Sequence, residues 1–329
     1  MQQTKDPAAW TRESVGGKPG ITVTLEEAHL SEIESILART RGRALQEIER
    51  EDFAAPQLNA LLAGVRKLLL RGPGAVLIDG VTPERFRPED FEKIFWGVGT
   101  HLGRPAVQSM RGDRLGYVQM ETDTNTTGRG SRSSAELYPH TDAFELVGLM
   151  CVRKAESGGL SRLVSALGVH NEILRTRPEL MPALYRGFPQ AVFEAKFSAQ
   201  PVTPYDIPVF SCVEGYVSCL YSRLFINAAA EKLGRPLPDD LVEALDYFEQ
   251  LNNGDVYGMD FLLEPGEMLF WNNYVVLHAR TAFKDTPEHR RLLLRLWLDV
   301  TPGRPVVPPL AAHGMLYERL YRDAAAAQA

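Results

Sequence analysis

The spacing of apolar and polar residues divides the chain into a helical first part and a longer part rich in strands. From about Leu25 to Gly72 apolar residues recur every three or four positions, a period that predicts helices. The run "GAVLIDG" (74–80) is short, mainly apolar and bounded by glycines, which is typical of a buried strand. Helical spacing then returns in "RPEDFEKIFWGVGTHLG", with Pro88 near its start, where helices favour proline.

Short strand patterns separated by turns dominate the rest of the chain. We expect strands at "GLMCVRK", "SRLVSA", "AVFEAKF", "IPVFSCV", "YVSCLYS", "MDFLLEPGEMLFWNNYVVLHAR" and "RLLLRLWLDV". Helices are expected at "GVHNEILRTRPELMPALYRGF", broken at Pro178, and at "PDDLVEALDYFEQLNN", whereas the polar segment 122–134 is expected to be a long loop. Strands with helices before and between them predict a mainly β sandwich or barrel wrapped by helices.

The same pattern suggests three stretches within one structural domain. They are an N-terminal helical cover over residues 1–73, a β domain with helical insertions over 74–303, and a C-terminal tail over 304–329 with an alanine-rich end that should fray. The formal charge is -6 and no basic block occurs, so nucleic acid is not an expected partner.

Cysteine usage and hydropathy point to a cytoplasmic protein. The three cysteines have no CxxC spacing, the N-terminus lacks a signal-peptide pattern, and no run of apolar residues is long enough to span a membrane. We therefore expect a small-molecule partner and no membrane partner, while a homo-oligomer stays open.

Candidate chemistry begins with "LYPHTDAFELVGLMCV", which places His140 and Asp142 in front of a strand. In extended chain, residues two apart point the same way, so both side chains can reach one point. Two imidazoles and one carboxylate are typical of non-haem Fe(II) sites. His278, at the end of an apolar strand pattern, is the best-placed second histidine; His289 lies in a charged turn and His313 in a late loop. An HxD sequence alone is equally typical of a capping turn.

A second signal lies in "RRLLLRLWLDV", where alternation places Arg291, Arg295 and Trp297 on one strand face and leucines on the other. Buried arginines need anionic partners, and a guanidinium pairs well with a carboxylate. The alternative is an edge strand whose arginines are solvated.

The HxD at 140 and 142, His278, and an arginine thirteen residues after it resemble the iron- and 2-oxoglutarate-binding signature of the Fe(II)/2-oxoglutarate-dependent dioxygenases. "HTDAFELVGLMCVRKAESGGLSRLVSALGVHNEIL" and "GEMLFWNNYVVLHARTAF" are similar to the taurine dioxygenase and clavaminate synthase-like branch of that family, and the similarity covers roughly residues 74–300. The resemblance implies a double-stranded β-helix (jelly-roll) core with α additions. It also implies oxidation of an unactivated C–H bond in a small organic substrate by O2, with release of succinate and CO2.

Site residues follow from the same resemblance. It implies iron ligands at His140, Asp142 and His278. It also implies that Arg291 binds the distal carboxylate of 2-oxoglutarate, helped by Ser161 of "GGLS", where the family usually has threonine. Arg295 matches a second arginine that contacts substrate or cosubstrate in relatives, and a substrate contact would favour an anionic substrate.

Further residues are assigned more loosely. Tyr117 and Gln119 are candidates for the substrate pocket, and Trp271, Asn272 and Asn273 are candidates to orient His278. Halogenating relatives replace the carboxylate that stands here at position 142, so hydroxylation is the first expectation, with desaturation, epoxidation and ring closure open. A jelly-roll zinc hydrolase and an inactive binding protein are the alternatives. The sequence does not indicate the substrate.

Overall fold

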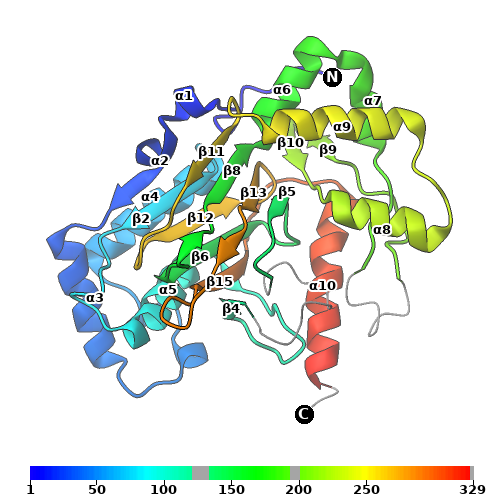
Figure 1. The fold of residues 1–329 in the computed structure, drawn as a ribbon. Helices are drawn as coiled ribbons and strands as arrows, with labels where there is room; N and C mark the ends of the chain where they lie inside the picture. The colour runs from blue at the N-terminus through cyan, green and yellow to red at the C-terminus, as the bar shows by residue number, and fades with distance from the viewer. Residues whose placement is uncertain (121–132, 193–200, 327–329) are drawn as a thin grey trace.

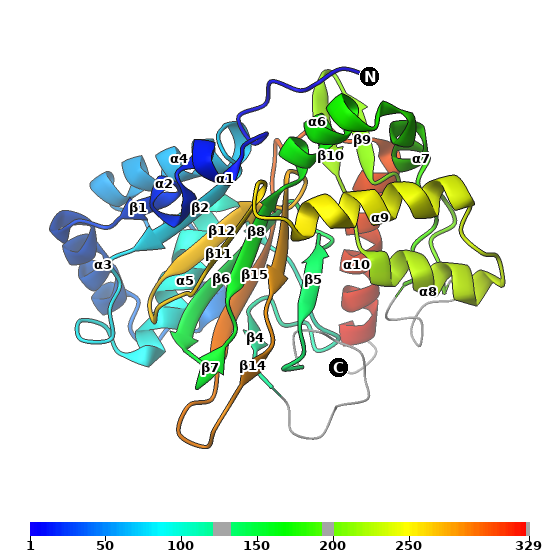
Figure 2. The same cartoon turned by 45° about the horizontal axis from the view of Figure 1, so that its top comes forward.

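A computed structural model describes residues 1–120, 133–192 and 201–326 of the chain (Figure 1). Its strands lie between N-terminal helices on one side and helices α8, α9 and α10 on the other, as Figures 1 and 2 both show. This arrangement agrees with the expected mainly β core with α additions.

The larger sheet has the strand order β1-β2-β12-β6-β15-β3, with β4 also paired to β15. The strands are β1 (Thr22–Thr24), β2 (Ala75–Asp79), β12 (Met268–Asn272), β6 (Leu146–Arg153), β15 (Leu292–Asp299), β3 (Arg104–Pro105) and β4 (Gly116–Val118). Only the β1–β2 pair is parallel among these described pairings. The predicted strands at 74–80, in "GLMCVRK" and in "RLLLRLWLDV" are confirmed.

The smaller sheet carries the order β11-β8-β13-β5, antiparallel throughout its described pairings. Its strands are β11 (Gly258–Phe261), β8 (Ser161–Ser165), β13 (Val276–Arg280) and β5 (Leu137–His140). Two hairpin-sized sheets pair β9 (Phe210–Val213) with β10 (Tyr216–Cys219), and β7 (Ser157–Gly158) with β14 (Phe283–Lys284). Together the sheets form the jelly-roll core.

N-terminal helices pack on the outer face of the larger sheet. They are α3 (Glu27–Arg39), α4 (Pro56–Arg71) and α5 (Pro88–Leu102), with η1 (Leu45–Glu47) beside α5. The short helices α1 (Arg12–Val15) and α2 (Gly17–Gly20) precede them, and α2 contacts β11. The predicted leucine face of β15 lies in this core, where Leu294, Leu296 and Leu298 are buried. A Cβ on Gly99 of α5 would lie 2.5 Å from Leu296 Cδ1, so glycine permits the close approach of helix and sheet.

A second set of helices covers the opposite side. They are α6 (Ala166–Thr176), η3 (Pro178–Leu180), α7 (Met181–Arg186), α8 (Arg223–Leu233), α9 (Asp239–Asn253) and α10 (Pro308–Ala326). The predicted break at Pro178 is confirmed. The pattern did not predict α8 or α10, and the stretch expected as a tail is mostly the amphipathic helix α10, with Leu310, Tyr317 and Tyr321 buried.

Some expectations fall on residues that the structure does not describe. Most of the expected loop 122–134 and most of "AVFEAKF" lie outside the described residues; Ala191 forms an isolated bridge with Val202. The boundaries at 73 and 303 stay predictions, although β1 joins the first stretch to the larger sheet. No helix in the described part of the chain is long and apolar enough to cross a membrane.

Candidate metal centre and cosubstrate pocket

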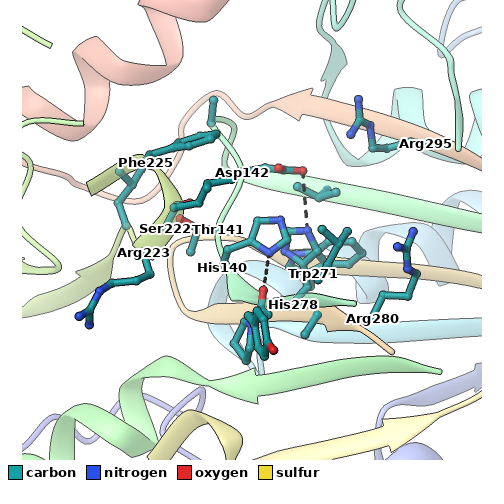
Figure 3. Close-up of a pocket in the computed structure, with 18 of the residues that line it drawn as sticks. His140, Thr141, Asp142, Ser222, Arg223, Phe225, Trp271, His278, Arg280 and Arg295 are labelled. Atoms are coloured by element: carbon teal, nitrogen blue, oxygen red, sulfur yellow. Dashed lines mark hydrogen bonds and ion pairs between the residues drawn. The ribbon is translucent and has the colours of Figure 1, made fainter. Parts of the chain in front are cut away.

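His140, Asp142 and His278 come together at one end of the smaller sheet (Figure 3). Antiparallel pairing of β5 and β13 sets His140 directly opposite His278, and their ring centroids lie 4.2 Å apart. Asp142 follows β5, with Oδ2 3.9 Å from His278 Nε2. One ligand atom from each residue lies within 4.8 Å of the others, and no other such cluster occurs among the residues that the structure describes. The three side chains could therefore share one metal ion.

The other two histidines considered from the sequence lie elsewhere. His289 is exposed and pairs with Glu156 at 2.8 Å. His313 is buried in α10 rather than in a loop, and it lines the same pocket as the triad without belonging to it. The structure thus groups His278, and neither of the alternatives, with the HxD sequence.

Hydrogen bonds fix the orientation of Asp142 and His140. Trp297 Nε1 donates to Asp142 Oδ2 at 2.8 Å, and the Asn273 side chain bonds both the backbone N–H and the carbonyl of Asp142, at 3.0 and 2.6 Å. His140 Nδ1 lies 2.8 Å from the carbonyl oxygen of Tyr138. When Nδ1 carries the proton for that bond, Nε2 is left with a lone pair for a metal.

The residues expected to orient His278 act differently from one another. The Trp271 ring packs on the His278 ring, with centroids 4.7 Å apart. Asn273 instead holds the loop that carries Asp142, and Asn272 Nδ2 donates to Glu145 at 3.3 Å. Only Trp271 of the three therefore has a described contact with His278 itself.

Electrostatics give His278 and Asp142 the protonation states that a divalent cation requires. Burial, together with the neighbouring His140, lowers the pKa of His278 to about 3, so the ring is neutral near pH 7. Burial acts to raise the pKa of Asp142. The neighbouring His278, Arg295 and His140, with the hydrogen bond from Trp297, outweigh burial and hold this pKa below its usual value. A neutral imidazole and an ionised carboxylate suit a metal, because ligands must be deprotonated.

Arg291 lies in the same pocket and is only 5% exposed. Its guanidinium carbon sits 5.2 Å from the centroid of the Phe283 ring, and Nη1 has no hydrogen-bond partner among the described residues. The buried Ser161 lines the pocket as well. Burial lowers the pKa of Arg291, so the described neighbours do not fully offset the cost of burying its positive charge. A buried guanidinium with a donor to spare fits an anionic ligand.

Arg280 is a second buried cation at this place, and sequence reasoning missed it. Its guanidinium also lies over Phe283, at 4.8 Å, and burial lowers its pKa to about 10. Its Nη2 donates to the carbonyl oxygens of Ser133, at 2.8 Å, and Ala135, which ties the start of the β5 segment to the strand of His278. The two-residue spacing from His278 was the available signal, because such residues share a strand face.

The predicted polar face of the arginine strand is confirmed. Arg291, Leu293, Arg295 and Trp297 all line the pocket. Arg295 stacks over Trp297 at 4.3 Å and donates from Nε to Gln108 Oε1 at 2.8 Å. Figure 3 places Arg295 on the same side of the triad as Arg280, with Ser222, Arg223 and Phe225 on the opposite side.

The structure places Val118, rather than Tyr117 or Gln119, on the pocket wall. In β4, Val118 pairs with Leu293 of the pocket face, so alternation directs its two neighbours the other way. Tyr117 is 50% exposed, and its hydroxyl donates to Glu92 of α5 at 2.8 Å. The sequence prediction chose the wrong parity because the pairing of β4 with β15 is not local.

The pocket has a volume of about 660 Å³. The sheets supply the triad and the arginines, and helices α8, α9 and α10 supply the facing wall, with Phe225, Asn252, His313 and Tyr321 among the lining residues. Such a chamber can hold a small chelating acid beside the metal and a second small molecule in front of it.

Fold and site together define a jelly-roll protein with a cluster of two histidines and one carboxylate that could hold a metal ion. Residues 41–297 match the family model described as taurine catabolism dioxygenase TauD, TfdA family, and the chain belongs to that family. It is a non-haem iron oxygenase that depends on 2-oxoglutarate, with Fe(II), 2-oxoglutarate and O2 as its cofactors.

Individual relatives agree with this assignment. The chain is 28% identical to FR-33289 synthase of Streptomyces rubellomurinus (strain ATCC 31215) over 319 residues, and this alignment covers 93% of each chain. It is 26% identical over 315 residues to taurine hydroxylase-like protein SAT17 of Stachybotrys chartarum (strain CBS 109288 / IBT 7711), covering 88% of this chain and 78% of that one. A solved asparagine oxygenase in complex with Fe(II), 2S,3S-3-hydroxyasparagine and succinate has a similar fold, with a TM-score of 0.69, 19% identity and coverage of 88% and 98%.

Proposed function

We propose that this chain hydroxylates an unactivated C–H bond of a small anionic substrate, with Fe(II) held by His140, Asp142 and His278. In the same proposal Arg291, assisted by Ser161, binds the distal carboxylate of 2-oxoglutarate. The observation that carries it is the buried Arg291, whose Nη1 lacks a partner among the described residues and which lines one pocket with the triad.

The donor atoms of these residues fit both Fe(II) and 2-oxoglutarate. The carbonyl of Tyr138 accounts for His140 Nδ1 and leaves Nε2 for the metal, while His278 is neutral and Asp142 is ionised. Two imidazoles and one carboxylate leave further positions of an octahedron for a chelating acid and for O2. Fe(II) held by these three residues would supply the oxidising chemistry that couples decarboxylation of 2-oxoglutarate to attack on the substrate.

The protein's own part is to orient and to exclude water. Trp297 keeps the Asp142 carboxylate in one rotamer, and Trp271 packs on the His278 ring. Arg291 fixes the far end of the cosubstrate, so that its other end reaches the metal. Apolar side chains from the sheet line the space between them, namely Val147, Leu149 and Leu293.

Arg295 is the residue that supports an anionic substrate. The Arg295 guanidinium lies close enough to lower the pKa of Asp142, so its positive charge acts on the proposed metal ligands. It can serve an anionic group of the substrate or the iron-bound end of 2-oxoglutarate. Taurine, for which the family is named, is a sulfonate, and this supports the first possibility.

Uncoupled decay of 2-oxoglutarate tests the proposal. With Fe(II) and ascorbate, the wild-type protein should form succinate without substrate, and His278→Ala should abolish it. His289→Ala is the matched control, because that histidine is exposed and paired with Glu156. A zinc hydrolase or an inactive binding protein would form no succinate. Retained turnover in His278→Ala with loss in His289→Ala would contradict the ligand assignment.

A cytoplasmic location is also proposed. It is supported by the three cysteines, Cys151, Cys212 and Cys219, which are all free thiols in the structure. Size-exclusion chromatography would decide between a monomer and a homo-oligomer.

A further inference from the structure

Three buried, uncharged polar side chains on the pocket wall have hydrogen-bonding atoms that no described protein group satisfies. Gln190 and Asn252 are each 1% exposed and His313 is 4% exposed. Among the described residues no partner exists for Gln190 Nε2, for either side-chain atom of Asn252, or for His313 Nδ1. All three residues line the pocket that holds the metal triad.

His170 and Asn272, two other buried residues of the same kinds, are satisfied by protein groups. His170 is fully buried, yet its Nε2 lies 2.9 Å from the Tyr185 hydroxyl. Asn272 accepts from the backbone N–H of Tyr274 at 3.0 Å and donates to Glu145. Because a buried polar group without a partner destabilises a fold, a bound ligand that hydrogen-bonds these pocket groups would remove a cost that the described residues leave uncompensated.

Gln190 lies in the segment after α7, Asn252 lies in α9 and His313 lies in α10. Gln190 precedes Ala191, whose N–H bonds the carbonyl of Phe225 at 3.0 Å. One turn before Asn252, Glu249 accepts from the Tyr221 hydroxyl and lies 3.4 Å from Arg223 Nη1. Phe225 and Arg223 lie across the triad from Arg280 and Arg295 in Figure 3. The segments that carry Gln190 and Asn252 thus contact elements on the side of the triad opposite Arg280 and Arg295.

Helix α10 is held firmly where it presents His313. Before the helix, the Arg304 guanidinium pairs with Asp6 at 2.6 Å, and its backbone N–H bonds Glu145 at 2.9 Å. Within the helix, a Cβ at Gly314 would lie 3.0 Å from the carbonyl oxygen of Ala143. The helix therefore packs against the residue that follows the metal ligand Asp142, and His313 has a fixed place in the chamber.

The chemistry of the three groups identifies what they can bind. Burial lowers the pKa of His313 to about 4, so its ring is neutral near pH 7, with one donor and one acceptor nitrogen. A carboxamide side chain also offers both a donor and an acceptor. A charged ligand group would be left without a counter-charge from these residues, whereas an uncharged group that both donates and accepts is matched by them.

We infer that Gln190, Asn252 and His313 bind an uncharged amide-type group of the substrate, either a carboxamide or an N-acyl amine. This inference rests on the proposed function, since it assigns the substrate end of the same pocket. It makes the substrate a small acid that carries an amide away from its acidic group.

The first experiment measures melting temperatures. His313→Phe and Asn252→Leu should leave the Tm unchanged or raise it, because they remove polar atoms that the protein does not satisfy. The matched controls His170→Phe and Asn272→Leu should lower it by about 3 °C or more, because each leaves a buried partner unpaired. An equal fall in all four variants would show that His313 and Asn252 are structural and would overturn the inference.

The second experiment measures binding of matched acids to the anaerobic protein with Fe(II) and 2-oxoglutarate, followed by thermal shift. The amide probes are N-acetylglycine and glutaramate, and their hydrocarbon counterparts are 4-methylpentanoate and 5-methylhexanoate. At least one amide should bind about tenfold or more tightly than its counterpart, and His313→Phe or Asn252→Leu should remove that preference. Equal binding of the hydrocarbons, or no amide binding up to about 10 mM, a millimolar limit for weak ligands, would overturn the inference.

Uncoupled succinate formation by the wild-type protein separates the two proposals. Its absence would count against the proposed function. Its presence together with hydrocarbon probes that bind as well as amides would leave the proposed function standing and remove only the amide assignment.

Discussion

The indole of Trp297 donates a hydrogen bond of 2.8 Å to Oδ2 of Asp142 and so connects the arginine strand β15 to a proposed iron ligand. The same indole lies under the Arg295 guanidinium at 4.3 Å and stacks on Phe144 at 5.3 Å. One side chain thus orients a ligand and supports a cation beside it. Substitutions on the pocket-lining face of β15 should therefore alter metal binding.

Trp297→Phe should weaken Fe(II) binding by about 10- to 100-fold, the usual effect of losing a hydrogen bond to a metal ligand. The comparison variant is Trp271→Phe, because the buried Nε1 of Trp271 has no hydrogen-bond partner within the described residues. Its effect on iron affinity should be smaller. Anaerobic iron titration measures both, and equal affinity in Trp297→Phe and the wild type would show that the hydrogen bond does not hold the ligand.

Arg291→Ala should raise the apparent KM for 2-oxoglutarate well over tenfold, since loss of a desolvated charge pair costs about 2–5 kcal/mol. Iron affinity should change little, because Arg291 is not a ligand. Arg290→Ala is the neighbouring control, as that side chain is exposed. An unchanged dependence on 2-oxoglutarate in Arg291→Ala would refute the assignment.

Arg295→Gln distinguishes a substrate contact from a cosubstrate contact. If Arg295 binds the anionic group of the substrate, coupled product formation should fall at least about tenfold, while uncoupled decay of 2-oxoglutarate falls much less. The two assays are run on the same preparation. An equal loss of both would move Arg295 to the iron-bound end of 2-oxoglutarate and withdraw the support for an anionic substrate.

Acidification should destabilise the protein through its buried neutral histidines. Burial lowers the pKa of both His170 and His313 to about 4, so below pH 6.5 the unfolded chain takes up protons that the folded protein does not. Their stabilising contribution is therefore complete above about pH 6.5 and falls towards pH 4, by roughly 1 kcal/mol per pH unit for each group.

Urea unfolding at several pH values between 7.5 and 5 measures the free energy of unfolding against pH. Its slope should appear below about pH 6.5, where histidines of the unfolded chain become protonated. His170→Gln should lower the overall stability but flatten the slope, because one titrating group is gone. A free energy of unfolding that stays constant or rises on acidification would contradict the buried, neutral state of these histidines.

Local patterns predicted the centre of the site. The two-residue period of a strand indicated that His140 and Asp142 could reach one point, and the resemblance to the dioxygenase signature was needed to add His278. The same period separated the arginines of β15 from its leucines. It also set Arg280 beside His278, but a single arginine in a strand carries no sign of being buried.

Non-local pairing accounts for what the sequence did not show. The parity of Tyr117 and Val118 depends on the register of β4 against β15, which no local signal sets. Helix α10 was hidden by its proline start and alanine-rich end, although apolar residues recur along it. The unsatisfied side chains of Gln190, Asn252 and His313 become visible only once three separate segments meet at one pocket.

The most direct test of the account is an anaerobic titration of the protein with Fe(II) and 2-oxoglutarate, followed by visible absorption. We predict one Fe(II) per chain and a weak visible band when 2-oxoglutarate chelates the bound iron, with both lost in His140→Ala, Asp142→Ala and His278→Ala. A band that persists in these variants, or a wild-type protein that binds no Fe(II), would contradict it.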